Sequence, residues 1–442
     1  MAVVGLRREL GLRTVVSTSA GLAFAAVNFL AVVQVATYTG AESLWVAIVT
    51  AAVLCLGAAL LFSELAARYP TAAGLRLWLR RGISDNFSLG FTLVYIVAIL
   101  LVVAADAFVL GSVVHAGLPG VPGVVWVVVA LGVIFLVNLR GVRMAGRLQD
   151  LTTYALLAGL FGLSLFSLAR HGLHPGRLWP PTGGGAGVAQ GIAEGIFIFV
   201  GFEWVTPLAE EVRTATALPP GMLVAVALLA VVFGTFGLAL TALGHAHALT
   251  ASTAPQLVVG RAALGAFGFW AMLVITAVTA ITTFNGAFVS GSRLLYALSR
   301  ERVLQPAFAH LNERMVPDRA LMALSASALV LALAVAITGR YQYLINMGAA
   351  IESAMYAAAA LALLGLRRRE PDAKPFFMAP GGTVLPVVVG VIFLLLAVIA
   401  ATLGWPWGLI VLAVIALASA YHVYRVAPGL RRGPRAAIGR RA

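Results

Sequence analysis

Four acidic residues lie inside long apolar stretches of this 442-residue chain: Asp106, Glu194, Glu203 and Glu352. A charged carboxylate at the centre of a membrane helix costs about 2.5 to 3.5 kcal/mol on insertion scales, so such residues normally pair with a partner or bind something. Burial favours the protonated form of a carboxyl group. The chemistry to expect of these four residues is therefore proton uptake and release, or the binding of a cation.

The elements that must position these acids are membrane-spanning helices. Hydrophobic residues make up 61% of the chain and charged residues only 10%, against about 25% charged in an average soluble domain. A span needs roughly 20 apolar helical residues. The apolar stretches predict an all-α membrane protein with twelve transmembrane helices, at about 14–38, 42–66, 87–113, 122–138, 149–168, 188–210, 221–244, 268–299, 321–337, 343–365, 382–401 and 405–425.

The distribution of basic residues predicts the orientation of these helices in the lipid bilayer. If both termini are cytoplasmic, only four of the 30 Lys and Arg residues lie outside, namely Arg170, Arg177, Arg261 and Arg340. This asymmetry is typical of a protein that crosses a bacterial inner (plasma) membrane many times. It also accounts for the net charge of +14 without any binding to nucleic acid.

Other function classes find little support in the sequence. Cys55 is the only cysteine, so neither an intrachain disulfide nor a cysteine metal cluster can form. No His-Glu-x-x-His, Gly-x-Ser-x-Gly or Walker motif is present. We therefore expect no enzyme, no metal site and no cofactor.

The spacing of the helices indicates two related halves within residues 1–365. The second helix of each half begins at 42 and 221, and the third at 87 and 268. Five helices per half would invert the second copy, as in many secondary transporters. We predict a ten-helix transport core over residues 1–365, with residues 366–442 forming two peripheral helices, 11 and 12, and a basic cytoplasmic tail.

Helices 1 and 6 contain residues that weaken a helix. Ser17 to Gly21 interrupt the first, and Gly191, Gly195, Gly201 and Pro207 interrupt the sixth. A broken membrane helix exposes backbone N–H and C=O groups, which is tolerated where they line a cavity. The N–H groups suit a carboxylate and the carbonyls suit an ammonium, which is what an amino-acid zwitterion needs. Alternatively, the small residues only allow close helix packing.

Three segments carry a family resemblance. They are Phe62-Ser63-Glu64-Leu65-Ala66-Ala67-Arg68-Tyr69-Pro70, Gly201-Phe202-Glu203 with Glu210-Glu211-Val212, and Ser292-Arg293-Leu294-Leu295-Tyr296-Ala297-Leu298. Together they resemble the amino acid/polyamine/organocation superfamily of transporters. The resemblance implies a five-plus-five inverted-repeat core with discontinuous helices 1 and 6 and a central site between helices 1, 3, 6 and 8. It also implies proton-coupled symport or exchange of amino acids or related small organic amines by alternating access.

The resemblance also implies which residues form the site. The family's Gly-[Ser/Thr]-Gly-[Ile/Val]-Phe motif reads Ser19-Ala20-Gly21-Leu22-Ala23-Phe24 here, with a serine in place of the first glycine and the aromatic one residue late. Glu203 matches the family's acid in helix 6 and is the expected proton-coupling residue, or else it only holds the unwound segment. The expected substrate-binding residues are Ser19, Ala20, Gly21, Phe24, Asp106, Phe199, Gly201, Phe202 and Asn285.

Two alternatives concern the coupling ion and the substrate charge. Threonines 276, 279 and 283 share a face of helix 8 and offer oxygen ligands for sodium, unless they bond the carbonyls of their own helix. The resemblance implies that some proton-coupled relatives carry a lysine in helix 5 where sodium-coupled proteins bind an ion, and residues 150–169 contain no lysine. A sodium-coupled symporter on the same fold therefore stays open, and a channel is the less favoured alternative. Asp106 and Glu194 would favour cationic substrates if they face the cavity. Alternatively, Asp106 pairs with a backbone group or a neighbouring helix, and snorkelling or a vestibule relieves the cost of Glu194. For Glu352 the alternative is a structural role.

Overall fold

The computed structural model describes residues 8–40, 43–172, 183–243 and 254–403, together with the single residues 6 and 420. Nine helices in these ranges are long and apolar enough to cross a membrane, or ten when one bent pair counts as a single span. The predicted all-helical, membrane-spanning fold is confirmed. The predicted twelfth span, 405–425, lies almost wholly outside the described residues.

The first predicted span is a broken helix. It consists of α1 (Leu12–Ala23) and α2 (Asn28–Thr39), which are bent by 54° relative to each other. The break lies at residues 24–27, so its expected place at residues 17–21 is wrong. Those residues are buried within α1, where Gly21 has the Thr153 and Gln149 side chains against it and no room for a Cβ. Here the small residues serve close packing.

The sixth predicted span is interrupted at Gly201, as expected. It runs through α8 (Gly184–Gly195) and the 3-10 segments η2 (Ile196–Phe199) and η3 (Phe202–Leu208). Gly201 has a φ of +108°, a conformation that favours glycine because it has no Cβ. A Cβ there would also come within 3.1 Å of the Ala23 nitrogen, so the breaks of helices 1 and 6 lie against each other.

The remaining elements are α3 (Leu44–Arg68), α4 (Gly74–Gly82), α5 (Asp85–Gly117), α6 (Gly123–Leu139), α7 (Val142–His171), η4 (Ala215–Ala217), α9 (Leu218–Leu243), α11 (Pro255–Arg300), η5 (Pro306–Ala309), α12 (Asp318–Thr338), α13 (Tyr341–Arg369) and α14 (Val384–Leu403). Among them, the short helices α4, η4 and η5 correspond to no predicted span. The long helices match predicted spans, with α6 the shortest at 17 residues, although α11 begins at Pro255, 13 residues before its predicted start at 268, and has non-helical backbone at Leu264 and Gly265.

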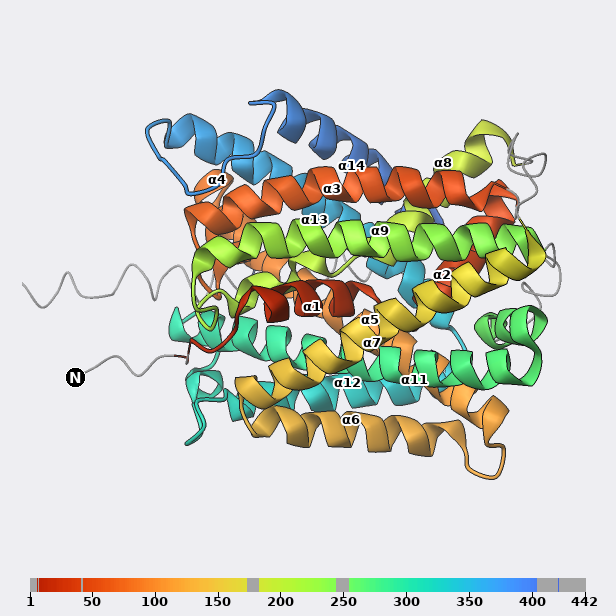
Figure 1. Ribbon diagram of the computed structural model, residues 1–442. Coiled ribbons are helices and arrows are strands. Elements are labelled where there is room, and N and C mark those ends of the chain that lie inside the picture. Colours follow the sequence, from red (N-terminus) through yellow and green to blue (C-terminus); the bar gives the residue numbers. More distant parts are fainter. Residues whose placement is uncertain are drawn as a thin grey trace, which may run out of the picture.

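The long helices run side by side, and the broken helix α1–α2 lies among them (Figure 1). α5 packs against α11, α12 and α13, whereas α1 packs against α7 and α9. α14 packs along α13 at one side of the bundle. This arrangement encloses the two breaks. The inverted-repeat relation of the halves and the boundary at residue 365 stay predictions.

Candidate transport site

Asp106 caps the broken first helix. Its Oδ2 accepts a hydrogen bond from the backbone N–H of Ala26 at 3.1 Å, and its Oδ1 accepts one from Val27 at 2.8 Å. Such N–H groups at the start of a helix have no intrahelical partner and carry the positive end of the helix dipole. Asp106 is fully buried in α5, so in this structure it pairs with backbone, which is the alternative expected from the sequence.

Asn28 joins the two breaks. Its side-chain Nδ2 donates to the carbonyl of Ala23 at the end of α1, at 2.6 Å, and to that of Ile198 in η2, at 3.0 Å. Its Oδ1 has no hydrogen-bond partner among the described residues. Asn28 is not among the residues expected from the sequence, although an asparagine four positions after Phe24 in an apolar stretch is the signal that could have indicated it.

Glu203 lies in a buried cluster of polar side chains from three elements. Its carboxyl oxygens accept hydrogen bonds from the hydroxyls of Tyr95 in α5, at 3.1 Å, and Tyr356 in α13, at 2.9 Å. The Glu352 carboxyl lies next to that of Glu203. Its Oε1 accepts a hydrogen bond from the Trp204 indole at 3.3 Å, and its Oε2 has no hydrogen-bond partner among the described residues. The structure thus brings together two acids that lie 149 positions apart in the sequence.

The other expected residues of helices 1 and 6 are buried around these groups. Ser19, Ala20 and Gly21 lie within helical α1, and the Ser19 hydroxyl has no partner in the described ranges. Phe24 ends α1 and packs edge to face on Phe233, with ring centroids 5.0 Å apart. Their contact with substrate stays a prediction.

The aromatic residues of helix 6 are packed inward. The Phe202 ring lies 5.9 Å from Phe62 and 5.5 Å from Tyr356, measured between centroids, and Phe199 is fully buried. Phe202 therefore covers the same tyrosine that bonds Glu203. Contact of Phe199 and Phe202 with substrate stays a prediction.

Asn285 belongs to a chain of neutral amides. Its Oδ1 accepts from the Asn138 side chain at 3.0 Å, and its Nδ2 donates to the Gln149 Oε1 at 2.8 Å. Gln149 and Thr153 then donate to the carbonyl of Ser17 in α1, at 3.5 and 3.0 Å. The chain ties α6, α11 and α7 to the first half of the broken helix.

The threonine stripe of α11 is accounted for within its own helix. The hydroxyls of Thr276, Thr279, Thr282 and Thr283 each donate to the carbonyl four residues earlier, at 2.7 to 3.3 Å. Such bonds are the ordinary way to satisfy a buried threonine. The hydroxyl groups of these four threonines therefore donate within their own helix, as the alternative from the sequence predicts.

Glu194 differs from the other three acids. It is fully buried in α8, and neither carboxyl oxygen has a hydrogen-bond partner within the described part of the chain. Snorkelling to an exposed surface, one expected explanation, is therefore wrong. Whether Glu194 faces the substrate pathway stays a prediction.

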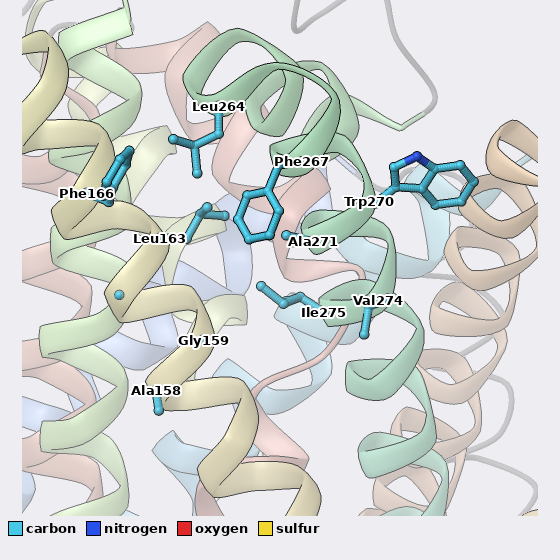
Figure 2. A pocket seen from close by; sticks show the side chains of 11 residues that line it. Ala158, Gly159, Leu163, Phe166, Leu264, Phe267, Trp270, Ala271, Val274 and Ile275 are labelled. Atoms are coloured by element: carbon cyan, nitrogen blue, oxygen red, sulfur yellow. The ribbon is translucent and has the colours of Figure 1, made fainter.

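A lateral groove of about 730 Å³ lies between α7 and α11, away from the breaks (Figure 2). Its lining is apolar and includes Leu163, Phe166, Phe267, Trp270 and Ile275. The Phe267 side chain is 73% exposed, as suits a surface that faces lipid tails. No expected site residue lines this groove, and it offers no partner for a zwitterion.

At the end of the bundle where α1 begins, the chain is tied to the segment after η3. The N–H groups of Glu9 and Leu10 donate to the Glu211 carbonyl at 2.8 and 3.0 Å, and the Arg213 N–H donates to the Leu10 carbonyl at 2.9 Å. The Glu211 carboxylate pairs with Arg293 of α11 at 2.8 Å, and both side chains are 1% exposed. This buried pair joins the segment after η3 to α11 at this end of the bundle.

Comparison with known proteins agrees with this arrangement. The sequence model described as amino acid permease matches residues 10–421. The branched-chain amino acid permease BcaP of Bacillus subtilis (strain 168) is 24% identical over 426 residues, which cover 90% of this chain and 89% of that protein. The vacuolar cationic amino acid transporter 2 of Arabidopsis thaliana is 29% identical over 210 residues, covering 45% of this chain and 32% of that protein.

The family match extends over nearly the whole chain, including both broken helices and the buried acids. It agrees with the resemblance in the three sequence segments. The chain therefore belongs to the amino acid permease family of the amino acid/polyamine/organocation superfamily, and it is a multi-pass membrane transporter rather than an enzyme.

Proposed function

We propose that this chain is a proton-coupled secondary transporter that moves amino acids, by symport or exchange, through alternating access. Its site is the junction of the broken helices, and its proton site is the pair Glu203 and Glu352. We place it in a bacterial inner membrane with both termini in the cytoplasm, on the distribution of its arginines.

The carboxyl pair carries the proposal. Two ionised carboxylates cannot hydrogen-bond to each other, because neither has a donor. The donors around the pair, Tyr95, Tyr356 and Trp204, already bond the carboxyl oxygens. Glu352 Oε2 has no donor among the described residues, and two buried carboxylates side by side repel each other, so the pair is expected to hold at least one proton. Such a pair takes up and releases protons as a unit.

The position of Glu203 links this proton to the moving backbone. It follows Gly201 by two residues, and Gly201 packs on α1 beside Ala23. A change in the charge of the pair alters the hydrogen bonds to α5 and α13 that hold η3 in place. Proton release can thereby be coupled to the rearrangement of both breaks.

The substrate is inferred to be a neutral amino acid in preference to a cationic one. Asp106 is engaged with the N–H groups of Ala26 and Val27, so it offers no unpaired charge to a substrate side chain in this structure. The Bacillus relative, which matches over the longer range, is a branched-chain amino acid permease. Glu194 is the remaining reason to test cationic substrates.

The coupling ion is tested by uptake into proteoliposomes. We expect labelled leucine to accumulate under an inward proton gradient and not under a sodium gradient alone. Dissipating the proton gradient with an uncoupler should abolish accumulation and leave counterflow intact. Accumulation driven by sodium alone would overturn the proposed coupling and favour a sodium symporter, while uptake without saturation would indicate a channel.

The orientation is tested with single cysteines, because the native Cys55 is fully buried. Met144, beside Arg143, and Leu118, after α5, are matched apolar sites with exposures of 43% and 45%. We expect an impermeant thiol reagent to label Met144→Cys only from the cytoplasm and Leu118→Cys only from outside. Labelling of both from one side would contradict the assigned topology.

A further inference from the structure

The backbone groups freed at the two breaks are already hydrogen-bonded in this structure. The N–H groups of Ala26 and Val27 donate to the Asp106 carboxylate at 3.1 and 2.8 Å. The carbonyls of Ala23 and Ile198 accept from the Asn28 side-chain amide at 2.6 and 3.0 Å. All four contacts involve buried side chains.

These contacts form the hydrogen-bond set that a zwitterion would make. A carboxylate accepts from two N–H groups at the start of a half-helix, where negative charge is favoured. An NH₂ group donates to two carbonyls from the ends of helical segments, where an ammonium would be favoured. Two further polar atoms, Asn28 Oδ1 and Ser19 Oγ, lack a partner within the described residues, so the junction has unused capacity for hydrogen bonds.

We propose that Asp106 and Asn28 act together as an internal surrogate for the substrate. They hold the breaks closed when no substrate is bound, and the α-carboxylate and α-ammonium of an amino acid displace them. This inference rests on the proposed function, because it takes the substrate to be a zwitterion.

A surrogate competes with substrate, and this distinguishes it from a fixed cap. Substrate binds only to the fraction of chains in which the surrogate has left, so the apparent affinity falls by that fraction. Removing the Asp106 carboxylate should therefore favour ligands that can use the vacated N–H groups. If Asp106 were a fixed cap instead, its removal would fray the start of α2 and give no advantage to a carboxylate ligand.

The experiment compares each amino acid with its decarboxylated amine. Binding of leucine and isoamylamine, and of arginine and agmatine, is measured on the purified full-length chain in detergent. In Asp106→Ala we expect the preference for the amino acid over the matching amine to rise about tenfold. This is the rise that follows if the surrogate occupies the site in about nine-tenths of the wild-type chains and in none of the variant chains. In Asp106→Asn, which keeps one acceptor oxygen and is milder for folding, we expect a rise of about threefold.

Asn28→Ala gives the mirror test at the carbonyls. It should raise the preference for leucine over isocaproate, the analogue without an amino group. The matched control is Thr92→Val, because Thr92 is buried on α5 like Asp106 but bonds only within that helix, to the Ser88 carbonyl at 2.7 Å. The control should change neither preference.

The outcomes separate the inference from the proposed function. If amino acids bind but neither preference rises in the folded variants, the surrogate is wrong and Asp106 is a fixed cap. If the folded wild-type chain binds and transports no amino acid, the proposed substrate class is wrong, and the surrogate falls with it.

Discussion

Replacing Glu203 with glutamine should abolish accumulation of substrate against a gradient while leaving exchange in place. Glutamine keeps a hydrogen-bonding side chain for Tyr95 and Tyr356 but cannot carry the titratable proton of the pair with Glu352. We expect steady-state accumulation in proteoliposomes to fall at least about tenfold, in line with the loss of a proton-transfer group. Counterflow of labelled substrate should change by less than about threefold, because binding does not use this proton.

The matched control for this variant is Glu194→Gln. It makes the same chemical change in the same span, at a carboxyl that bonds no described residue. Accumulation should survive there. Equal loss of binding and accumulation in Glu203→Gln would instead assign Glu203 to holding the unwound segment. Loss of accumulation in both variants would place the proton site elsewhere in helix 6.

The largest expected loss of stability comes from Arg293→Met. Arg293 and Glu211 form a buried ion pair at 2.8 Å, and removing one partner of such a pair costs about 3 to 5 kcal/mol because a buried charge is left unpaired. Thermal unfolding in detergent should report this as a lower melting temperature. The double variant Glu211→Gln with Arg293→Met should recover much of the loss, since it leaves no buried charge.

The stability loss in Arg293→Met should also depend on pH. Burial raises the pKa of Glu211 above its usual range, and Arg293 opposes that rise. Without the arginine the pKa of Glu211 rises further, so at low pH Glu211 is protonated and the unpaired charge disappears. The stability loss should therefore have its full size at pH values above this raised pKa. It should shrink as the pH falls through that pKa.

A surface pair provides the control for Arg293. Arg13 lies 3.7 Å from Asp150, and the Arg13 side chain is 73% exposed, so Arg13→Met should cost no more than about 1 kcal/mol at any pH. A loss of that size in Arg293→Met would show that water reaches the Glu211 pair. The segment after η3 would then be open at this end in solution.

The sequence by itself determined which segments cross the membrane, because that requirement is local. A span needs a continuous apolar stretch whatever it packs against, and the expected ranges fall on the long helices from α3 to α14, although α11 begins 13 residues earlier than expected. Gly201 could also be predicted as a break, because glycine weakens a helix wherever it occurs, and its φ of +108° in the structure confirms that prediction. The acids stood out for the same kind of reason, since charge is costly in any apolar span.

Only the tertiary structure decided where helix 1 breaks and which acids work together. Ser17 to Gly21 were expected to interrupt the helix, yet they stay helical because α7 packs against them. The break forms at residues 24–27, where Asp106 from α5 bonds the freed N–H groups across about 80 residues of sequence.

The proposed proton site also depends on tertiary packing. Glu203 and Glu352 are 149 positions apart in the sequence. Of the two tyrosines that complete their cluster, Tyr356 shares α13 with Glu352, and Tyr95 comes from α5. A membrane helix can leave backbone groups and carboxyls inside the bilayer only if other helices satisfy them. Those partners are fixed by the packing of the bundle and not by the local sequence.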